Sequence, residues 1–260
     1  MTPGLFRRYT WLLAAVPLCI TGCGKKGPLI YPDLLVPAAP TDLEARQTGS
    51  AVRLSFALPS KDMAGRRYDG LTEVRVVRRT ETTGQPPVCT ACSDNYAPLR
   101  TIDLRTLPSD IERYGSLVML LDGNVATGRR YSYRVTAIGG EGIQGGTSAP
   151  AAAVVGDAPL PPVLQVVNQP TEINLEFVGL PPEQGAIAGY QVYRSVKGMP
   201  QPLQPLTSKP VSTNRYTDQG LDRNTTYVYG VRTVAVRNGT GEFVESDLSN
   251  LAEGRLKDDE

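Results

Sequence analysis

From residue 40 onward the chain consists of short runs in which apolar and polar residues alternate, separated by Gly, Pro, Asn and Asp. The runs at 52–58, 73–78 and 131–137 are typical examples. A period of two lets one face of a strand be buried while the other stays in water. No long segment has the period of a helix, so the pattern predicts an all-β fold of the sandwich or barrel type.

The same runs occur twice. The matching segments are 52–59 with 173–181, 73–78 with 190–194, and 131–137 with 227–233. Tyr131 and Tyr227 begin the last pair, and each suits a tyrosine corner, in which the hydroxyl bonds back to a nearby backbone group. The repeat predicts two tandem β-sandwich modules, a first module at 40–157 and a second module at 158–254, with a tail at 255–260.

Segments 189–195 and 245–250 resemble the third strand and the closing segment of bacterial fibronectin type III modules. Phe56 and Phe177 stand where most members carry Trp. The resemblance implies an immunoglobulin-like β-sandwich for both modules. It covers about residues 40–254 and is stronger in the second module. The joint at 156–162 is rich in Pro, which predicts a stiff connection and a limited range of angles between the modules.

The chain contains no His, which excludes Ser-His-Asp and Cys-His catalysis and His-containing zinc sites. Cys89 and Cys92 lie in an insertion around 80–113 of the first module. In an oxidising envelope this pair predicts a disulfide that closes a short loop, with a redox-active pair or free or intermolecular thiols as alternatives. We therefore expect no metal or cofactor and no enzymatic activity.

Residues 1–22 have a positive start and an apolar core that is too short to cross a membrane, as in a signal peptide. The segment Ile20-Thr-Gly-Cys23 resembles the lipobox of bacterial lipoproteins. This resemblance implies that Cys23 is lipidated and becomes the first residue of the mature chain. Gly24 at the next position favours the outer membrane, and we expect the periplasmic face.

Residues 23–32 resemble the N-terminus of the small outer-membrane lipoproteins that assist the lipopolysaccharide translocon (LptM-type). The matching residues are Gly24, Lys26, Gly27, Pro28, Leu29 and Pro32. The resemblance implies docking on an outer-membrane assembly machine. The alternative is a plain lipidated tether over 23–39, whose lysines lie near anionic head groups. Residues 33–40 are rich in Pro and predict an extended spacer that does not pack.

The chain has 27 basic and 26 acidic residues, and removal of residues 1–22 leaves 25 and 26. This balance argues against nucleic-acid binding. The pairs at 66–67, 78–79 and 129–130 are Arg-Arg, and we expect them on solvated strand faces.

Gly140–Gly145 satisfies G-x-G-x-x-G but precedes another predicted strand, which favours a hairpin loop over a nucleotide site. Tyr193 and Phe243 are either packed or exposed for stacking on sugar or peptide.

The sequence therefore predicts a lipid-anchored envelope protein that binds or scaffolds a protein or polysaccharide partner. Two alternatives stay open. One is an accessory of the lipopolysaccharide translocon that acts through residues 23–32, and the other is a non-catalytic module of a carbohydrate-acting or redox system. The sequence leaves the oligomeric state undetermined.

Overall fold

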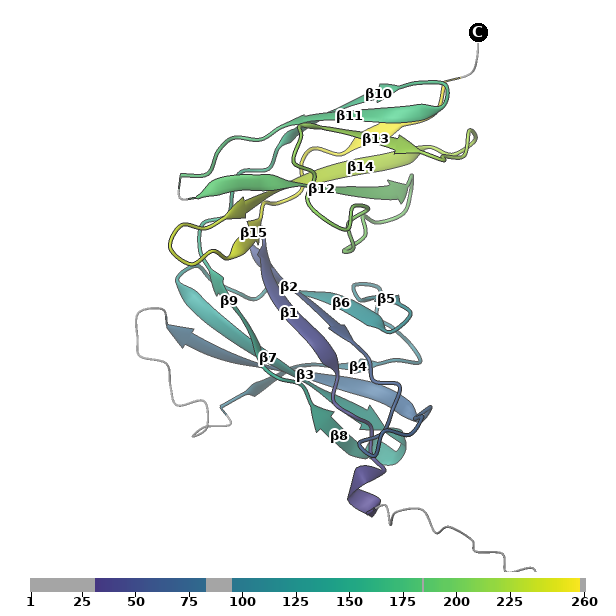
Figure 1. The fold of residues 1–260 in the computed structure, drawn as a ribbon, viewed down its shortest axis with the longest axis vertical. Helices are drawn as coiled ribbons and strands as arrows, with labels where there is room; N and C mark the ends of the chain where they lie inside the picture. The colour runs from purple at the N-terminus through teal and green to yellow at the C-terminus, as the bar shows by residue number, and fades with distance from the viewer. Residues whose placement is uncertain (1–30, 83–94, 184, 258–260) are drawn as a thin grey trace, which may run out of the picture. The chain divides into compact units, whose positions relative to one another are not determined.

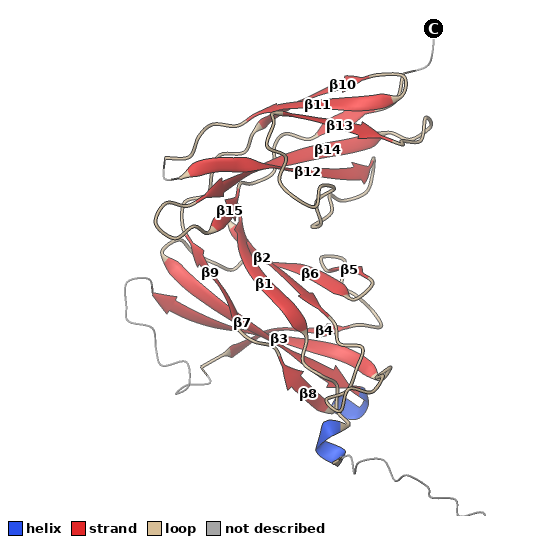
Figure 2. Cartoon of the chain, viewed as in Figure 1, coloured by secondary structure: helices blue, strands red, loops and turns tan. Residues whose placement is uncertain are grey.

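The computed structural model describes residues 31–82, 95–183 and 185–257, and most of its regular structure is strand (Figures 1 and 2). The first module contains β1 (Thr41–Thr48), β2 (Ala51–Ala57), β3 (Leu71–Thr82), β4 (Ala97–Asp103), β5 (Glu112–Tyr114), β6 (Leu117–Asp122), β7 (Arg129–Gly139), β8 (Gln144–Thr147) and β9 (Ala151–Val155). The second contains β10 (Val163–Asn168), β11 (Glu172–Val178), β12 (Ala186–Val196), β13 (Arg215–Gln219), β14 (Tyr227–Val236), β15 (Phe243–Glu245) and β16 (Ala252–Gly254). The short 3-10 helices are η1 (Pro32–Leu34) and η2 (Gly140–Gly142).

Two sheets form the first module. One has the strand order β1-β2-β6-β5, and the other has the order β4-β3-β7-β8, with β9 also paired to β7. Alternate side chains of β2 point inward, so Val52, Leu54 and Phe56 are fully buried in a core that also includes Tyr133. Phe56 therefore occupies the core position that the resemblance to fibronectin type III modules predicts.

The second module has the sheets β10-β11-β13 and β12-β14-β15, with β16 also paired to β14. Its core contains Phe177 and Tyr190, whose ring centroids lie 4.8 Å apart, and extends to the buried Leu256. Two separate cores, each enclosed by two sheets, confirm the predicted all-β fold of two tandem sandwiches.

Tyr131 and Tyr227 begin equivalent stretches of β7 and β14. The Tyr131 hydroxyl accepts a hydrogen bond from the Ala126 N–H at 2.8 Å, and the Tyr227 hydroxyl accepts one from the Asp222 N–H at 3.0 Å. In both modules the donor lies five residues upstream. Each contact has the geometry of a tyrosine corner and ties the loop before the strand to the sheet.

The glycine-rich segment at 140–145 connects β7 to β8 as a hairpin through η2. Glu141 in this turn has a φ of +58°, in the left-handed region. The predicted hairpin loop is confirmed.

The spacer at 33–40 packs against the first module, so the expectation of an unpacked spacer was wrong. Ala38 N–H donates to Lys61 O at 2.9 Å, and Gly146 N–H donates to the carbonyl of the buried Pro37 at 2.8 Å. A Cβ atom on Gly145 would lie 2.2 Å from Pro37 O, so a residue without a side chain is required for this approach. Proline cannot donate a hydrogen bond, but its carbonyl still accepts one, and this is how the segment is held.

The insertion around 80–113 supplies two strands to the first module. β4 pairs with β3, and β5 pairs with β6. The two cysteines in this insertion, Cys89 and Cys92, lie outside the described residues.

An arginine, an aspartate and a tyrosine meet between the sheets in each module. In the first, Arg78 Nη1 and Tyr133 Oη donate to Asp122 Oδ2 at 2.7 and 2.9 Å. In the second, Arg194 Nη1 lies 2.8 Å and Tyr229 Oη 2.8 Å from Asp218 Oδ2. Both aspartates are 4% exposed. Each buried charge is therefore paired and hydrogen-bonded, as burial requires.

Asp122 also affects the pKa of the Tyr133 hydroxyl. Burial raises the pKa of Tyr133, and the nearby Asp122 carboxylate raises it further. The phenol consequently stays neutral and continues to donate its proton to the carboxylate throughout the neutral range.

Arg78 and Arg79 are therefore not on a solvated face, contrary to expectation. Arg78 lies between the sheets, and Arg79 is 8% exposed, is ion-paired with Glu81, and stacks over Tyr96 at 5.2 Å. Arginine can bury its long apolar stem, and a buried head group is tolerated when a carboxylate pairs with it.

Asp122→Ala would remove the carboxylate that Arg78 and the Tyr133 hydroxyl share inside the first module, and among the described residues would leave Arg78 only the Asn124 carbonyl as an acceptor. We expect a loss of about 3 kcal/mol in the free energy of unfolding, because breaking a buried pair leaves a charge unpaired. Urea unfolding followed by circular dichroism measures it. Asp110→Ala is the matched control, since its pair with Arg100 is exposed and we expect a loss below about 1 kcal/mol. Equal losses in the two variants would contradict the assigned role of Asp122.

Candidate functional site at the junction of the two modules

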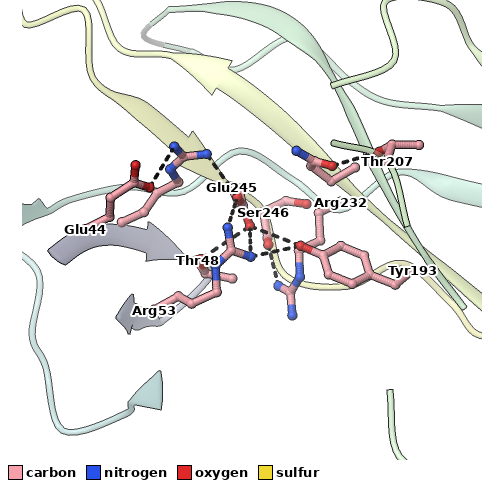
Figure 3. Close-up of polar contacts among 10 residues, drawn as sticks. Glu44, Thr48, Arg53, Tyr193, Thr207, Arg232, Glu245 and Ser246 are labelled. Carbon is pink, nitrogen blue, oxygen red and sulfur yellow. Dashed lines mark hydrogen bonds and ion pairs between the residues drawn. The ribbon is translucent and has the colours of Figure 1, made fainter. Parts of the chain in front are cut away.

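The junction between the modules is built around one buried carboxylate (Figure 3). Glu245, on β15 of the second module, is 0% exposed. Arg53, on β2 of the first module, donates to it from both terminal nitrogens, Nη1 to Oε2 at 2.8 Å and Nη2 to Oε1 at 2.5 Å. The pair is bidentate, which is the strongest arrangement that an arginine and a carboxylate form.

Further groups complete the surroundings of this pair. Arg53 Nη1 also donates to the Tyr193 hydroxyl at 3.0 Å, and Thr48 Oγ1 lies 3.4 Å from Glu245 Oε2. Arg46 Nη1 lies 3.6 Å from Glu245 Oε1. Residues from β1, β2, β12 and β15 therefore share one ion-pair network.

The network keeps its charges in place. Burial lowers the pKa of Arg53, but the attraction of Glu245 and the hydrogen bonds more than offset this, so its pKa is raised overall. Burial raises the pKa of Tyr193, and Glu245 raises it further. At neutral pH the guanidinium is therefore charged and the phenol is neutral.

The backbone also crosses the junction. β15 pairs with β1 in parallel, with Thr48 opposite Glu245, and Gly49 N–H donates to Glu245 O at 2.8 Å. One sheet of each module thereby becomes part of a continuous sheet of eight strands. The pairing also covers the end of β1, which would otherwise be an open strand edge.

Further side-chain contacts lie outside this network. The Gln47 side chain bonds to both backbone groups of Gly156, and Arg237 Nη2 donates to Gln47 Oε1 at 2.9 Å. Elsewhere, Leu203 N–H of the second module donates to the Glu112 carboxylate of the first at 2.8 Å. Side-chain contacts, in addition to the prolines of the joint, therefore connect the modules.

A groove of about 580 Å³ opens beside the joint. Its apolar walls are formed by Val154, Val155, Ala158, Pro159, Leu160, Pro181 and Pro182. The polar and charged side chains that line it are those of Thr127, Asp157, Glu183 and Arg237. A concave, mostly apolar site of this size with a few polar groups is typical of ligand-binding sites, which often lie between domains.

The residues predicted from the N-terminal motifs lie largely outside the described part. This applies to Cys23, Gly24, Lys26, Gly27, Pro28 and Leu29. Pro32 is the first residue of η1 and is exposed.

Tyr193 and Phe243 have different environments. Tyr193 is 2% exposed in the ion-pair network, so it packs and is unavailable for stacking on a ligand. Phe243 is 48% exposed, with the Arg46 guanidinium 6.0 Å from its ring centroid.

The sequence pattern predicts neither the central ion pair nor the two buried aspartates. Asp122 precedes Tyr133 by eleven residues, as Asp218 precedes Tyr229, so the repeat carried a signal for these aspartates. Arg53 carried none, because its outward position on β2 predicts a solvated side chain. The second module covers that position.

The described residues contain no group of three or more His, Cys, Asp or Glu side chains that could hold a metal ion. Within these residues, no helix has the length and apolar character needed to cross a membrane.

No protein-family profile and no curated protein matches the chain. Among solved structures, the FN1–FN3 domains of chicken CNTN1 are 15% identical, with a TM-score of 0.30 over 85% of this chain and 68% of that one. A Fn3-like protein from Clostridium thermocellum is 29% identical, with a TM-score of 0.30 over 40% of this chain and 99% of that one. The assignment of the fold rests on the strand order and the two cores.

Glu245→Ala would leave Arg53 buried without its carboxylate. We expect a loss of at least about 3 kcal/mol in the free energy of unfolding, and looser coupling of the modules. Urea unfolding measures the first effect, and small-angle X-ray scattering measures the second as a larger radius of gyration.

The matched control is Glu253→Ala, because Glu253 and its partner Lys197 are exposed and we expect less than about 1 kcal/mol. The double variant Arg53→Met with Glu245→Leu should recover much of the loss, since it removes both buried charges. If Glu245→Ala unfolded like the control, the network would not be what couples the modules.

Proposed function

We propose that this protein is a non-catalytic binding or scaffolding lipoprotein of the cell envelope, anchored to the outer membrane through lipid on Cys23. The observation that carries the binding part of this proposal is the groove beside the junction. It is concave and mostly apolar, and the contacts of Gln47 and Arg237 support its walls. A β-sandwich with a preformed groove suits recognition of a partner.

The lipobox-like segment at 20–23 supports the anchor. The apolar core is too short to cross a membrane, and the Cys that follows two small residues is what makes the segment resemble a lipobox. Two or more acyl chains on Cys23 would anchor the chain stably, whereas one alone binds only marginally.

In the native host, Cys23→Ala should lose the protein from the membrane fraction, and crosslinking should capture envelope partners only with the anchored protein. Fractionation and mass spectrometry of crosslinked material measure both effects. Cys19→Ala is the matched control, because this cysteine lies inside the predicted signal and its loss should leave anchoring intact. A Cys23→Ala protein that remained in the outer-membrane fraction with its partners would refute the anchored function.

A second candidate is an accessory role at the lipopolysaccharide translocon, favoured by the matching residues between Gly24 and Pro32. A variant lacking residues 24–32, with Cys23 retained, separates this role from binding through the sandwiches. Loss of translocon components from the crosslinked material would support it, because anchoring is unchanged while the motif is gone. An unchanged set of partners would eliminate it.

A further inference from the structure

The walls of the junction groove come from segments whose backbone is restricted. The joint contributes the buried Pro159, and the loop after β11 contributes Pro181 and Pro182. Proline fixes its own φ, so these walls lose little conformational freedom when a ligand binds. The groove is thus preformed for a ligand with an apolar side chain.

Exposed apolar side chains also flank the joint and the ends of β10 and β11. Leu160, Val163, Val178 and Leu180 are 59–65% exposed, and Val163 and Val178 are paired opposite each other across the two strands. We call these four residues the valine-leucine patch. Neighbouring exposed apolar side chains next to a groove mark an interaction surface. A ligand that fills the groove and reaches the patch must be elongated.

The unpaired charges that line the groove are both negative. Asp157 and Glu183 are exposed, and the structure records no ion pair for either carboxylate within the residues it describes. Arg237 is already engaged, since Nη1 donates to Val154 O at 3.2 Å and to Glu242 Oε2 at 3.2 Å, and Nη2 donates to Gln47. Among its described lining residues, the groove therefore offers two carboxylates to a cation and no free cation to an anion.

From these observations we propose that the groove and the valine-leucine patch bind an extended peptide segment in which aliphatic residues lie next to lysine or arginine. Successive side chains of an extended peptide point to opposite sides. Aliphatic side chains can therefore contact the apolar walls while basic ones reach Asp157 or Glu183. This inference names the partner chemistry of the proposed binding function and rests on that function, but it does not depend on the lipid anchor.

The test uses the full chain in a non-ionic detergent and three fluorescent peptides. They are Gly-Lys-Leu-Lys-Val-Gly, in which the lysines share one side and the aliphatic residues the other, its charge-reversed form Gly-Glu-Leu-Glu-Val-Gly, and Gly-Lys-Ser-Lys-Ser-Gly, which lacks the aliphatic residues. Fluorescence anisotropy gives the dissociation constants. We expect the first peptide to bind about tenfold tighter than either of the others, and its binding to weaken as salt is added.

Two variants locate the binding. Leu160→Ser should weaken binding of the first peptide about tenfold, and the double variant Asp157→Asn with Glu183→Gln should weaken it about tenfold, or about threefold for each carboxylate. All three positions are on the surface, so the fold should be retained, which circular dichroism checks. Met199→Ser is the matched control for Leu160→Ser, because Met199 is 65% exposed outside the groove.

Equal binding of the charge-reversed peptide, binding unaffected by these variants, or no binding of the first peptide would each overturn the proposal. Failure of the groove assignment can be distinguished from failure of the proposed binding function. If crosslinking in the host captures envelope partners while the groove variants bind peptide like the wild type, the binding function stands and the assignment of the groove falls.

Discussion

A carboxylate that is completely removed from water must find its partners inside the protein, and Glu245 finds them on both modules. Moving the modules apart would expose both side chains to water and lose the bidentate pair, whereas an arrangement that kept them covered but separated would leave two buried charges unpaired, which costs several kcal/mol. Such a pair need not stabilise the protein more than apolar residues of the same shape would. Its effect is to select one arrangement of β1, β2, β12 and β15 over the alternatives.

Inside each module the same physical rule acts on a smaller scale. Asp122 and Asp218 are buried between sheets, and each accepts hydrogen bonds from an arginine and a tyrosine on neighbouring strands. A shift of strand register by one residue would move the arginine to the other face of its sheet and leave the aspartate unpaired. Buried charges therefore specify the register within the modules and the contact between them.

These constraints bear on binding. A groove between two loosely linked modules would have to be ordered each time that a ligand binds, and this ordering would weaken the affinity. Here Gln47 and Arg237 connect the joint to the strands on both sides, so the walls that line the groove are already in place. The geometry of the groove is thus a consequence of the same contacts that join the modules.

The sequence by itself determined the features that depend on neighbouring residues. Alternation and repetition predicted two sandwiches, Phe56 and Phe177 filled the expected core positions, and the glycines at 140–145 formed the expected hairpin. Local pattern failed at the spacer at 33–40, which packs through carbonyls and close backbone approach. It also failed at Arg78, whose partner Asp122 lies on another strand, and at Arg79, which stacks on Tyr96, a residue outside its own strand.

Only the tertiary structure decided the junction. Arg53 and Glu245 are 192 residues apart, and the position of each on its own strand is that of an ordinary surface residue. The groove likewise combines residues of the joint, β9 and the loop after β11, which no pattern along the chain connects. Burial of these residues results from one module covering the other, and strand periodicity reports only which face of a sheet a residue is on, not what covers that face.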